Sequence, residues 1–223
     1  MGLKADSGVM SLVRKSRLVA IVRLDDLSHA LPLSEALFNG GITVQEFTLT
    51  NPHALEVISA CRDQLTYFQS GNAVIGAGSV RCTDDARRAI GAGAQFIVTP
   101  ILDLHVIEHC VSSNIPIMCG ALTPTEIATA WSAGASAVKV FPVRGLGPDY
   151  VRDVLAPMPE LALMPTGGVG LENLADYLAA GACAVGVGGK LIDSQAVAAQ
   201  DWSTVSHVAE QYASLAANTA FSG

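Results

Sequence analysis

The chain has little positive charge and no long apolar run. Its 13 lysine and arginine residues face 20 aspartate and glutamate residues, which leaves a net charge of -7 at neutral pH. Nucleic acids and acidic membranes require clustered basic side chains, so we expect neither as a partner. No uncharged apolar stretch approaches the roughly 20 residues that span a bilayer. The segment Met1–Lys15 also lacks the apolar centre of a signal peptide.

Cysteine is scarce and scattered. The chain has five cysteines and no Cys-x-x-Cys pair: Cys61, Cys82, Cys110, Cys119 and Cys183. The odd number and the irregular spacing predict neither a disulfide framework nor a structural zinc site. We therefore expect a cytoplasmic protein whose partner is a small molecule.

Apolar residues are abundant, but they fall into eight short runs. Segments between these runs have apolar residues at helical spacing and often end in glycine, as in 26–38, 83–92, 123–133 and 171–180. Strand followed by helix, repeated eight times, predicts an α/β protein with a single (β/α)8 barrel, the TIM-barrel fold. An open doubly wound sheet is the alternative. The predicted strands are 19–22, 43–49, 73–75, 95–98, 115–118, 135–141, 161–164 and 182–187.

One domain is predicted for residues 1–223, with the barrel proper from about residue 18 to residue 193. A leading helix over 6–17 precedes the barrel, and a closing helix over 202–217 follows it. Glycines near residues 40, 93, 134 and 181 recur one or two residues before a strand, as glycines that end helices do.

Only four lysines occur, and Lys139 lies inside the sixth apolar run. Alternation along a strand places it with Ala137 and Phe141 in the barrel interior, while Val138 and Val140 face the helices. Active sites of such barrels lie at the carboxyl ends of the strands, near Lys139. Burial can lower a lysine pKa and produce the neutral amine that attacks carbonyl groups. A lysine that reaches solvent or pairs with a carboxylate is the alternative.

Two further charged residues are predicted to point into the barrel near the carboxyl ends of its strands, as Lys139 does. Glu46 is a carboxylate inside the second apolar run, on the inward face, and Arg23 continues the inward face of the first run. Gln45 then faces the helices, for which the sequence offers no reason. Charge pairing alone is the alternative explanation for this convergence, because buried charges need partners.

Glycine-rich segments follow three of the predicted strands: 76–79, 165–168 and 186–189. Glycine lets backbone N–H groups approach an anion, and loops after strands 7 and 8 of a barrel often hold a phosphate. Ordinary turns are the alternative, since glycine is common in them.

Six segments in this order resemble one enzyme family: 20–23, 46–52, 76–80, 98–100, 139–142 and 165–169. Over roughly residues 18–193, the chain is similar to the 2-keto-3-deoxy-6-phosphogluconate (KDPG), 2-keto-3-deoxy-6-phosphogalactonate and 4-hydroxy-2-oxoglutarate aldolases. The resemblance implies a homotrimeric class I aldolase without metal or cofactor, cleaving a 4-hydroxy-2-keto acid to pyruvate and an aldehyde such as glyceraldehyde 3-phosphate or glyoxylate. Lys139 would form the Schiff base, and Glu46 would be the general acid and base. The implied substrate-binding residues are Arg23, Thr50, Ser79, Pro100, Phe141, Thr166, Gly167, Gly168, Gly188 and Gly189.

The chain departs from the family pattern at three positions. Thr50 stands where many members have arginine, so Arg23 would take over part of the carboxylate binding. Ser79 replaces a common threonine. Gly189 and Lys190 stand where phosphate-binding members often have a serine after the glycine. Either Lys190 supplies that anion contact or the substrate is unphosphorylated, and the sequence leaves the substrate open.

Three other activities fit the same residues. The iminium formed on Lys139 would also decarboxylate oxaloacetate. A phosphosugar isomerase or synthase would use Glu46 as a base without covalent catalysis. A trimeric barrel that binds a ligand without catalysis is the third. The isomerase alternative predicts no Schiff base.

Overall fold

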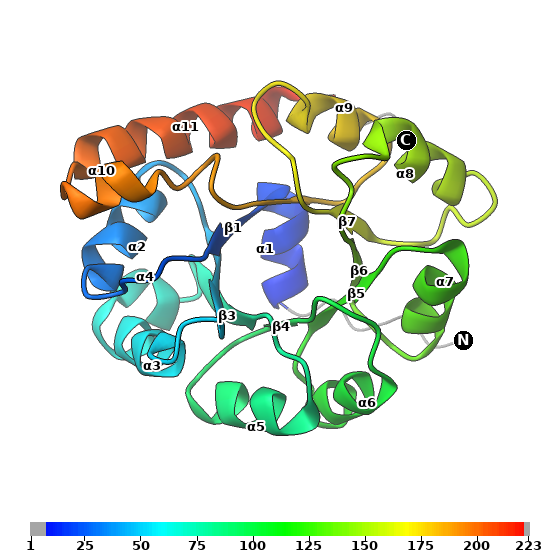
Figure 1. Cartoon of the computed structure of the whole chain (residues 1–223), viewed down its shortest axis with the longest axis horizontal. Coiled ribbons are helices and arrows are strands. Elements are labelled where there is room, and N and C mark those ends of the chain that lie inside the picture. Colours follow the sequence, from blue (N-terminus) through cyan, green and yellow to red (C-terminus); the bar gives the residue numbers. More distant parts are fainter. Residues whose placement is uncertain (1–7, 221–223) are drawn as a thin grey trace.

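Eight parallel strands form the centre of the structure, a computed structural model that describes residues 8–220 (Figure 1). Their order around the sheet is β7-β6-β5-β4-β3-β2-β1-β8, and a bridge between Thr166 and Gly186 joins its two ends. This order confirms the barrel and excludes the open doubly wound sheet. The strands are β1 (Leu18–Val22), β2 (Val44–Thr48), β3 (Val74–Gly78), β4 (Ile97–Val98), β5 (Ile117–Ala121), β6 (Ala137–Val140), β7 (Leu163–Pro165) and β8 (Val185–Val187).

Helices surround the barrel, and two of them begin later than predicted. The helix expected from residue 26 begins at Ala30, because Asp26 accepts a hydrogen bond from the Ser28 N–H in a turn. The helix expected from residue 171 begins at Leu174. None of the described helices is long and apolar enough to cross a membrane. The surrounding helices are α2 (Ala30–Asn39), α3 (Ala54–Gln64), α4 (Thr66–Gln69), α5 (Thr83–Gly91), α6 (Leu104–Ser112), α7 (Pro124–Ser132), α8 (Gly147–Leu155), α9 (Leu174–Ala179), α10 (Ser194–Ala198) and α11 (Trp202–Asn218).

Glycine ends four of these helices, as predicted. Gly41, Gly93, Gly134 and Gly181 have φ values of 89°, 94°, 108° and 101°. At α2, Gly41 N donates to the Phe38 carbonyl, and the next N–H donates to the Leu37 carbonyl. This pair of bonds is the Schellman motif, which satisfies the last carbonyls of a helix and needs a left-handed residue. The motif turns the chain from the helix back toward the next strand.

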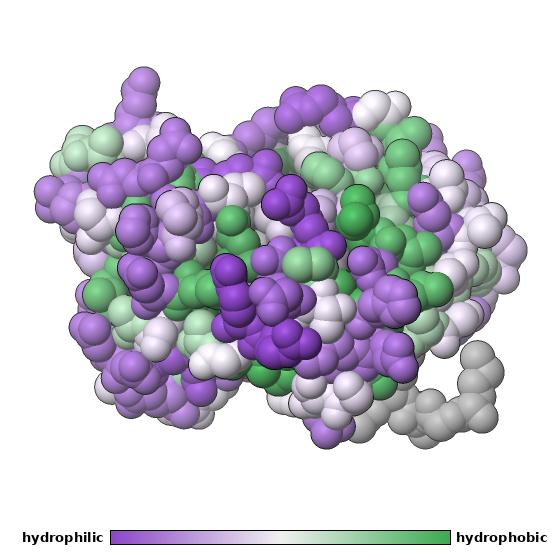
Figure 2. All heavy atoms as spheres, turned by 60° about the horizontal axis from the view of Figure 1, so that its bottom comes forward, coloured by the Kyte–Doolittle hydropathy of each residue, from purple (hydrophilic) through white to green (hydrophobic). Residues whose placement is uncertain are grey.

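Hydrophilic side chains cover much of the outer surface, with apolar patches between them (Figure 2). Ile101 and Leu104 are 51% and 50% exposed, near the start of α6. Leu104 also lines an open groove along α7, together with apolar Pro124, Ala128, Ala133 and Met158 and polar Thr125, Thr129 and Ser132. This groove is therefore a mainly apolar surface on the outside of the barrel.

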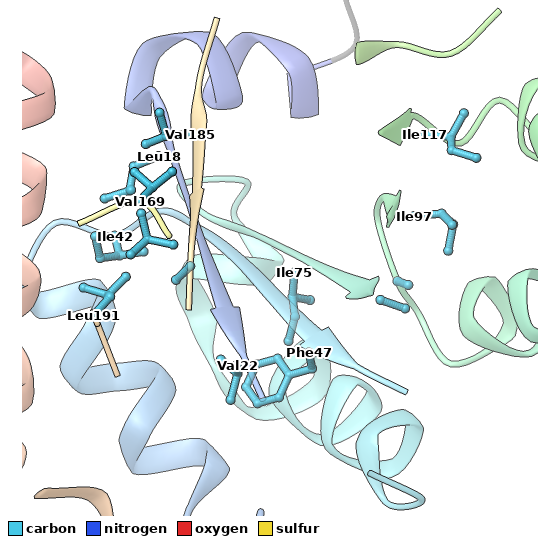
Figure 3. Close-up of a cluster of buried hydrophobic side chains, with 14 of the residues drawn as sticks. Leu18, Val22, Ile42, Phe47, Ile75, Ile97, Ile117, Val169, Val185 and Leu191 are labelled. Atoms are coloured by element: carbon cyan, nitrogen blue, oxygen red, sulfur yellow. The ribbon is translucent and has the colours of Figure 1, made fainter. Parts of the chain in front are cut away.

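A large apolar core lies between the strands and the surrounding helices. It contains Val138 and Val140, as the alternation in β6 predicted. Leu18 and Val185, which are partners in register, lie together in it (Figure 3). The unexplained Gln45 also faces this layer, where its side chain bonds to the hydroxyl and the carbonyl of Ser34 in α2. Its buried amide is thereby satisfied.

A second core fills the inside of the barrel. Met10 and Val13 of α1 (Gly8–Ser16) pack there against inward side chains such as Val19, Val44 and Phe96. When the barrel is viewed end-on, α1 lies over the centre of the ring of strands (Figure 1). The leading helix is thus confirmed, although its expected start at residue 6 lies outside the described residues. Because α1 and these side chains fill the amino end, the carboxyl ends of the strands remain available for a site.

Candidate active site

Lys139 and Glu46 face each other inside the barrel, from β6 and β2. The Lys139 Nζ lies 4.0 Å from the Glu46 Oε1, and their side chains are 5% and 0% exposed. Strand alternation accounts for both positions, so the predicted inward orientation is confirmed. Among the described residues, neither carboxylate oxygen of Glu46 has a hydrogen-bond partner. A buried carboxylate so placed is able to exchange a proton with a group held near Lys139.

Burial raises the pKa of Glu46 above its ordinary value. The positive charges of Lys139 and Arg23 act in the opposite direction, but burial has the larger effect. The carboxyl group therefore keeps its proton at pH values where an exposed glutamate is ionised. Raised carboxyl pKa values of this kind suit groups that both give and take protons.

Gly78 makes room for the Glu46 side chain. A Cβ at Gly78 would overlap the Glu46 Oε1, and a Cβ at Gly76 would overlap the Phe96 ring. The prediction that 76–79 is a turn after the third strand is therefore wrong, because Gly76 and Gly78 lie within β3. Their lack of side chains is needed for packing inside the barrel.

Phe141 follows β6 and lies beside the amine of Lys139. The Nζ is 5.3 Å from the centre of the Phe141 ring, within the range of a cation–π contact. The ring thus covers the lysine and also forms part of the adjacent cavity wall. No three His, Cys, Asp or Glu side chains within residues 8–220 gather as metal ligands.

A cavity of about 430 Å³ opens at the carboxyl ends of β1, β6, β7 and β8. Its volume lies in the usual range for small-molecule sites. Seven of the predicted substrate-binding residues line it, while Lys139 and Glu46 do not. The lining residues are Ile21, Arg23, Phe141, Arg144, Thr166, Gly167, Gly168, Val169, Gly186, Gly188, Gly189 and Lys190.

Three of the predicted substrate-binding residues lie outside this cavity. Thr50 is exposed, and its hydroxyl is 2.8 Å from the Thr48 hydroxyl. Ser79 is half-buried with a φ of 58°, directly after β3. Pro100 follows β4, and its backbone packs so closely on Gly120 that no Cβ would fit there. These three residues follow β2, β3 and β4, so they lie at the carboxyl ends of the strand that carries Glu46 and of the next two strands.

Arg144 lines the cavity, and sequence reasoning missed it. It lies in the loop after β6, where it packs against Gly168. Lys190, which the sequence did single out, also lines the cavity and forms an ion pair with Glu172. A search for isolated cations just after each predicted strand would have found Arg144, because those loops form the mouth of a barrel.

Comparisons with known proteins agree with this geometry. A family model described as "KDPG and KHG aldolase" matches residues 9–208. The 2-dehydro-3-deoxy-phosphogluconate aldolase of Treponema pallidum is 34% identical over 204 residues, covering 91% of this chain and 95% of that protein.

Solved structures give the same result. A native KDPGal structure superposes with a TM-score of 0.81 at 32% identity, covering 89% of this chain and 93% of the other. The KDPG aldolase of Legionella pneumophila, captured with pyruvate as a covalent carbinolamine intermediate, superposes with a TM-score of 0.81 at 26% identity. Its alignment covers 90% of this chain and 96% of that protein.

Proposed function

Because the chain belongs to the KDPG and KHG aldolase family and is therefore a lyase, we propose that it cleaves a 4-hydroxy-2-keto acid to pyruvate and an aldehyde through a Schiff base on Lys139. The observation that carries this proposal is the buried pair formed by Lys139 and Glu46, 4.0 Å apart beside the cavity. The carbinolamine trapped in the Legionella pneumophila relative supports the same chemistry.

Lys139 begins the reaction as a nucleophile. Once it has lost a proton, its amine adds to the C2 carbonyl of the keto acid, forms a carbinolamine and loses water to give an iminium ion. The shielding of Lys139 by the Phe141 ring supports this role, since a site with little water favours the condensed form.

Glu46 then moves the protons. As the C3–C4 bond breaks, its carboxylate takes the proton of the C4 hydroxyl, and the bonding electrons pass to the iminium to give an enamine and a free aldehyde. The same carboxyl group returns a proton to C3 of the enamine, and water releases pyruvate from Lys139. Its raised pKa supports both steps, because a carboxyl group titrating nearer neutrality donates and accepts protons with similar ease.

The two ends of the substrate are bound by different parts of the mouth. Arg23 lies near enough to Glu46 to affect its pKa, which suits a contact with the keto acid carboxylate. Thr50, Ser79 and Pro100 follow the strands on the same side and complete the pyruvate site. The distal end of the substrate enters the cavity, where the glycine turns 167–168 and 188–189 offer backbone donors.

We also infer that the protein assembles as a homotrimer in the cytoplasm. The family resemblance implies this state, and the exposed Ile101 and Leu104 at the groove along α7 support it, because exposed apolar patches mark interfaces. Sedimentation equilibrium tests it: a mass of one chain contradicts the trimer.

The reaction is tested by coupling pyruvate release to a dehydrogenase, with a panel of 4-hydroxy-2-keto acids. We expect cleavage by the parent chain and a loss of about a thousandfold or more in Lys139→Met, because the covalent route is gone. Lys15→Met, on the exposed face of α1, is the matched control and keeps full activity. Equal activity of the two variants contradicts the proposal.

A further inference from the structure

Thr99 stands directly after β4, the shortest strand of the barrel. Only Ile97 and Val98 belong to β4, where they pair with Ile117 and Met118 of β5. The Thr99 N–H continues this pairing with a bond of 3.2 Å to the Met118 carbonyl. The Thr99 side chain is fully buried. A buried hydroxyl needs partners, and those of Thr99 lie in β5 and in the loop after β4.

The Thr99 hydroxyl replaces a main-chain group of the ladder. It accepts a hydrogen bond from the Gly120 N–H at 2.9 Å and donates one to the Ile101 carbonyl at 2.7 Å. The Cys119 sulfur lies farther away, at 3.6 Å. In a regular parallel pair continued from this register, the Gly120 N–H would donate to the Thr99 carbonyl. Because the hydroxyl takes that bond, the main chain leaves the ladder after Val98 and the buried donor stays satisfied.

Gly120 provides the space into which the loop after β4 folds. It has the same inward orientation in β5 as Met118, which lies in the core inside the barrel. A Cβ at Gly120 would lie 2.4 Å from the Pro100 carbonyl carbon and 2.6 Å from the Ile101 nitrogen. The Pro100–Ile101 peptide therefore occupies the place of a side chain inside the barrel.

This peptide lies next to the strand position of Lys139. Gly120 and Lys139 are register partners in β5 and β6, and register partners of parallel strands point to the same face of the sheet. The peptide that packs on Gly120 is therefore the neighbour of the Lys139 side chain on the β5 side. Pro100 is only half-buried, so part of it remains accessible at the carboxyl ends of the strands. A shift of the loop would change the wall beside the amine.

We propose that Thr99 is a positioning residue of the pyruvate site, whose hydroxyl holds the Pro100–Ile101 peptide in place beside Lys139. This inference rests on the proposed aldolase function and on the place of Pro100 in the pyruvate site. Thr99 itself acts only through the loop, because its hydroxyl is bonded to Gly120 and Ile101. Loss of the hydroxyl removes both bonds at once. A buried donor without a partner is unfavourable, so the loop moves toward another arrangement.

The test removes the hydroxyl from side chains of two sizes. Thr99→Val replaces it with a methyl group, and Thr99→Ala differs from Thr99→Ser by the hydroxyl alone. The readout is the pyruvate concentration that gives half-maximal trapping on Lys139 with cyanoborohydride. We expect this concentration to rise about tenfold in Thr99→Val and Thr99→Ala, and to stay within about twofold of the parent in Thr99→Ser. The trapping rate at saturating pyruvate changes less, because Lys139 and Glu46 keep their places in β6 and β2.

Thr219→Val is the matched control. The Thr219 hydroxyl also donates to a carbonyl, that of Leu215 at 2.8 Å, but it lies at the end of α11. The same substitution there removes one hydroxyl bond and leaves the half-maximal pyruvate concentration unchanged.

Thermal unfolding of the same variants separates positioning from a purely structural role. If Thr99→Val and Thr99→Ala unfold at lower temperature but keep the half-maximal concentration of the parent, the hydroxyl only stabilises the fold and this inference is overturned. Equal weakening in Thr99→Ser and Thr99→Ala also overturns it, because the hydroxyl is then not the cause. If Thr99→Val does not fold, the comparison of Thr99→Ala with Thr99→Ser decides. A parent chain on which no pyruvate is trapped refutes the proposed function, whereas trapping that is equal in all variants refutes this inference alone.

Discussion

Glu46 illustrates how one buried carboxyl group depends on the charges around it. Burial raises its pKa, and the cations Lys139 and Arg23 oppose that effect. As pH falls through this raised pKa, the carboxylate gains a proton and loses its ability to act as the base in bond cleavage. The acid limb of activity therefore lies above the ordinary carboxyl pKa of 4.5.

The pH profile of kcat tests this dependence. We expect Arg23→Gln to move the acid limb to higher pH, because the variant loses a positive charge that favours the ionised form of Glu46. Arg152→Gln serves as the control for a change in net charge and leaves the limb in place. An acid limb near pH 4.5 in the parent, or one unmoved in Arg23→Gln, contradicts this account of Glu46.

Gly78 offers a second test at the scale of one residue. In Gly78→Ala, the new methyl group would occupy the position of the Glu46 carboxylate and displace it. We expect kcat/KM to fall about a hundredfold, since a displacement of roughly 1 Å at a catalytic group has that effect. Gly91→Ala, at the end of α5 with no atom within 4 Å of the added Cβ, is the matched control. Circular dichroism verifies folding, and a fully active Gly78→Ala enzyme contradicts the role of Gly78.

Gly78 also shows why some details of the site could not be predicted from the sequence. Glycine has low strand propensity, so the sequence pattern predicts a turn over 76–79. The need for glycine in β3 arises from Glu46 in β2 and from Phe96, which directly precedes β4. That crowding exists only once the barrel has closed. The inward positions of Lys139 and Glu46, by contrast, followed from alternation within a single strand.

At the scale of secondary-structure elements, Arg17 links the two ends of the described chain. It lies between α1 and β1 with a φ of 58° and is only 5% exposed. Its guanidinium group donates to the carbonyls of Ala216 and Thr219, at the end of α11. Because those carbonyls have no partner within the helix, the arginine provides the cap that the helix lacks.

Replacement of Arg17 therefore destabilises the barrel. We expect Arg17→Met to lower the free energy of unfolding by about 2 kcal/mol, the usual value for buried hydrogen bonds to a charged group. Lys15→Met, two residues earlier and exposed, changes it by about 0.5 kcal/mol or less. Urea denaturation followed by circular dichroism measures both. Equal midpoints for the two variants would show that Arg17 does not hold α11 in place.

Element boundaries were predicted well where the signal is local. The Schellman glycines at 41, 93, 134 and 181 lie where the repeat placed them, because the left-handed position is required by the helix end itself. The start of α2 was placed four residues too early, since the Asp26 turn breaks the helix before the apolar periodicity does. The boundary depends on one side-chain hydrogen bond, which periodicity does not reveal.

At the scale of the whole molecule, the barrel was predictable because strand and helix alternate eight times and parallel strands are uniformly apolar. The position of α1 was not, because nothing in an amphipathic helix specifies that it closes the amino end of the ring. Arg144 and Lys190 line one cavity because four loops, which are distant in the sequence, meet in the folded barrel. Their proximity is therefore not visible in the sequence. Charge at a barrel mouth is thus a property of the assembled fold.

The central claim, a Schiff base on Lys139, is tested most directly by the mass of the intact protein after incubation with pyruvate and borohydride. We predict one pyruvate-derived addition on the parent chain, located by peptide mapping at Lys139, and none on Lys139→Ala. Lys15→Ala is the control and gains the addition as the parent does. An unmodified parent chain, or an addition that persists in Lys139→Ala, would contradict the account.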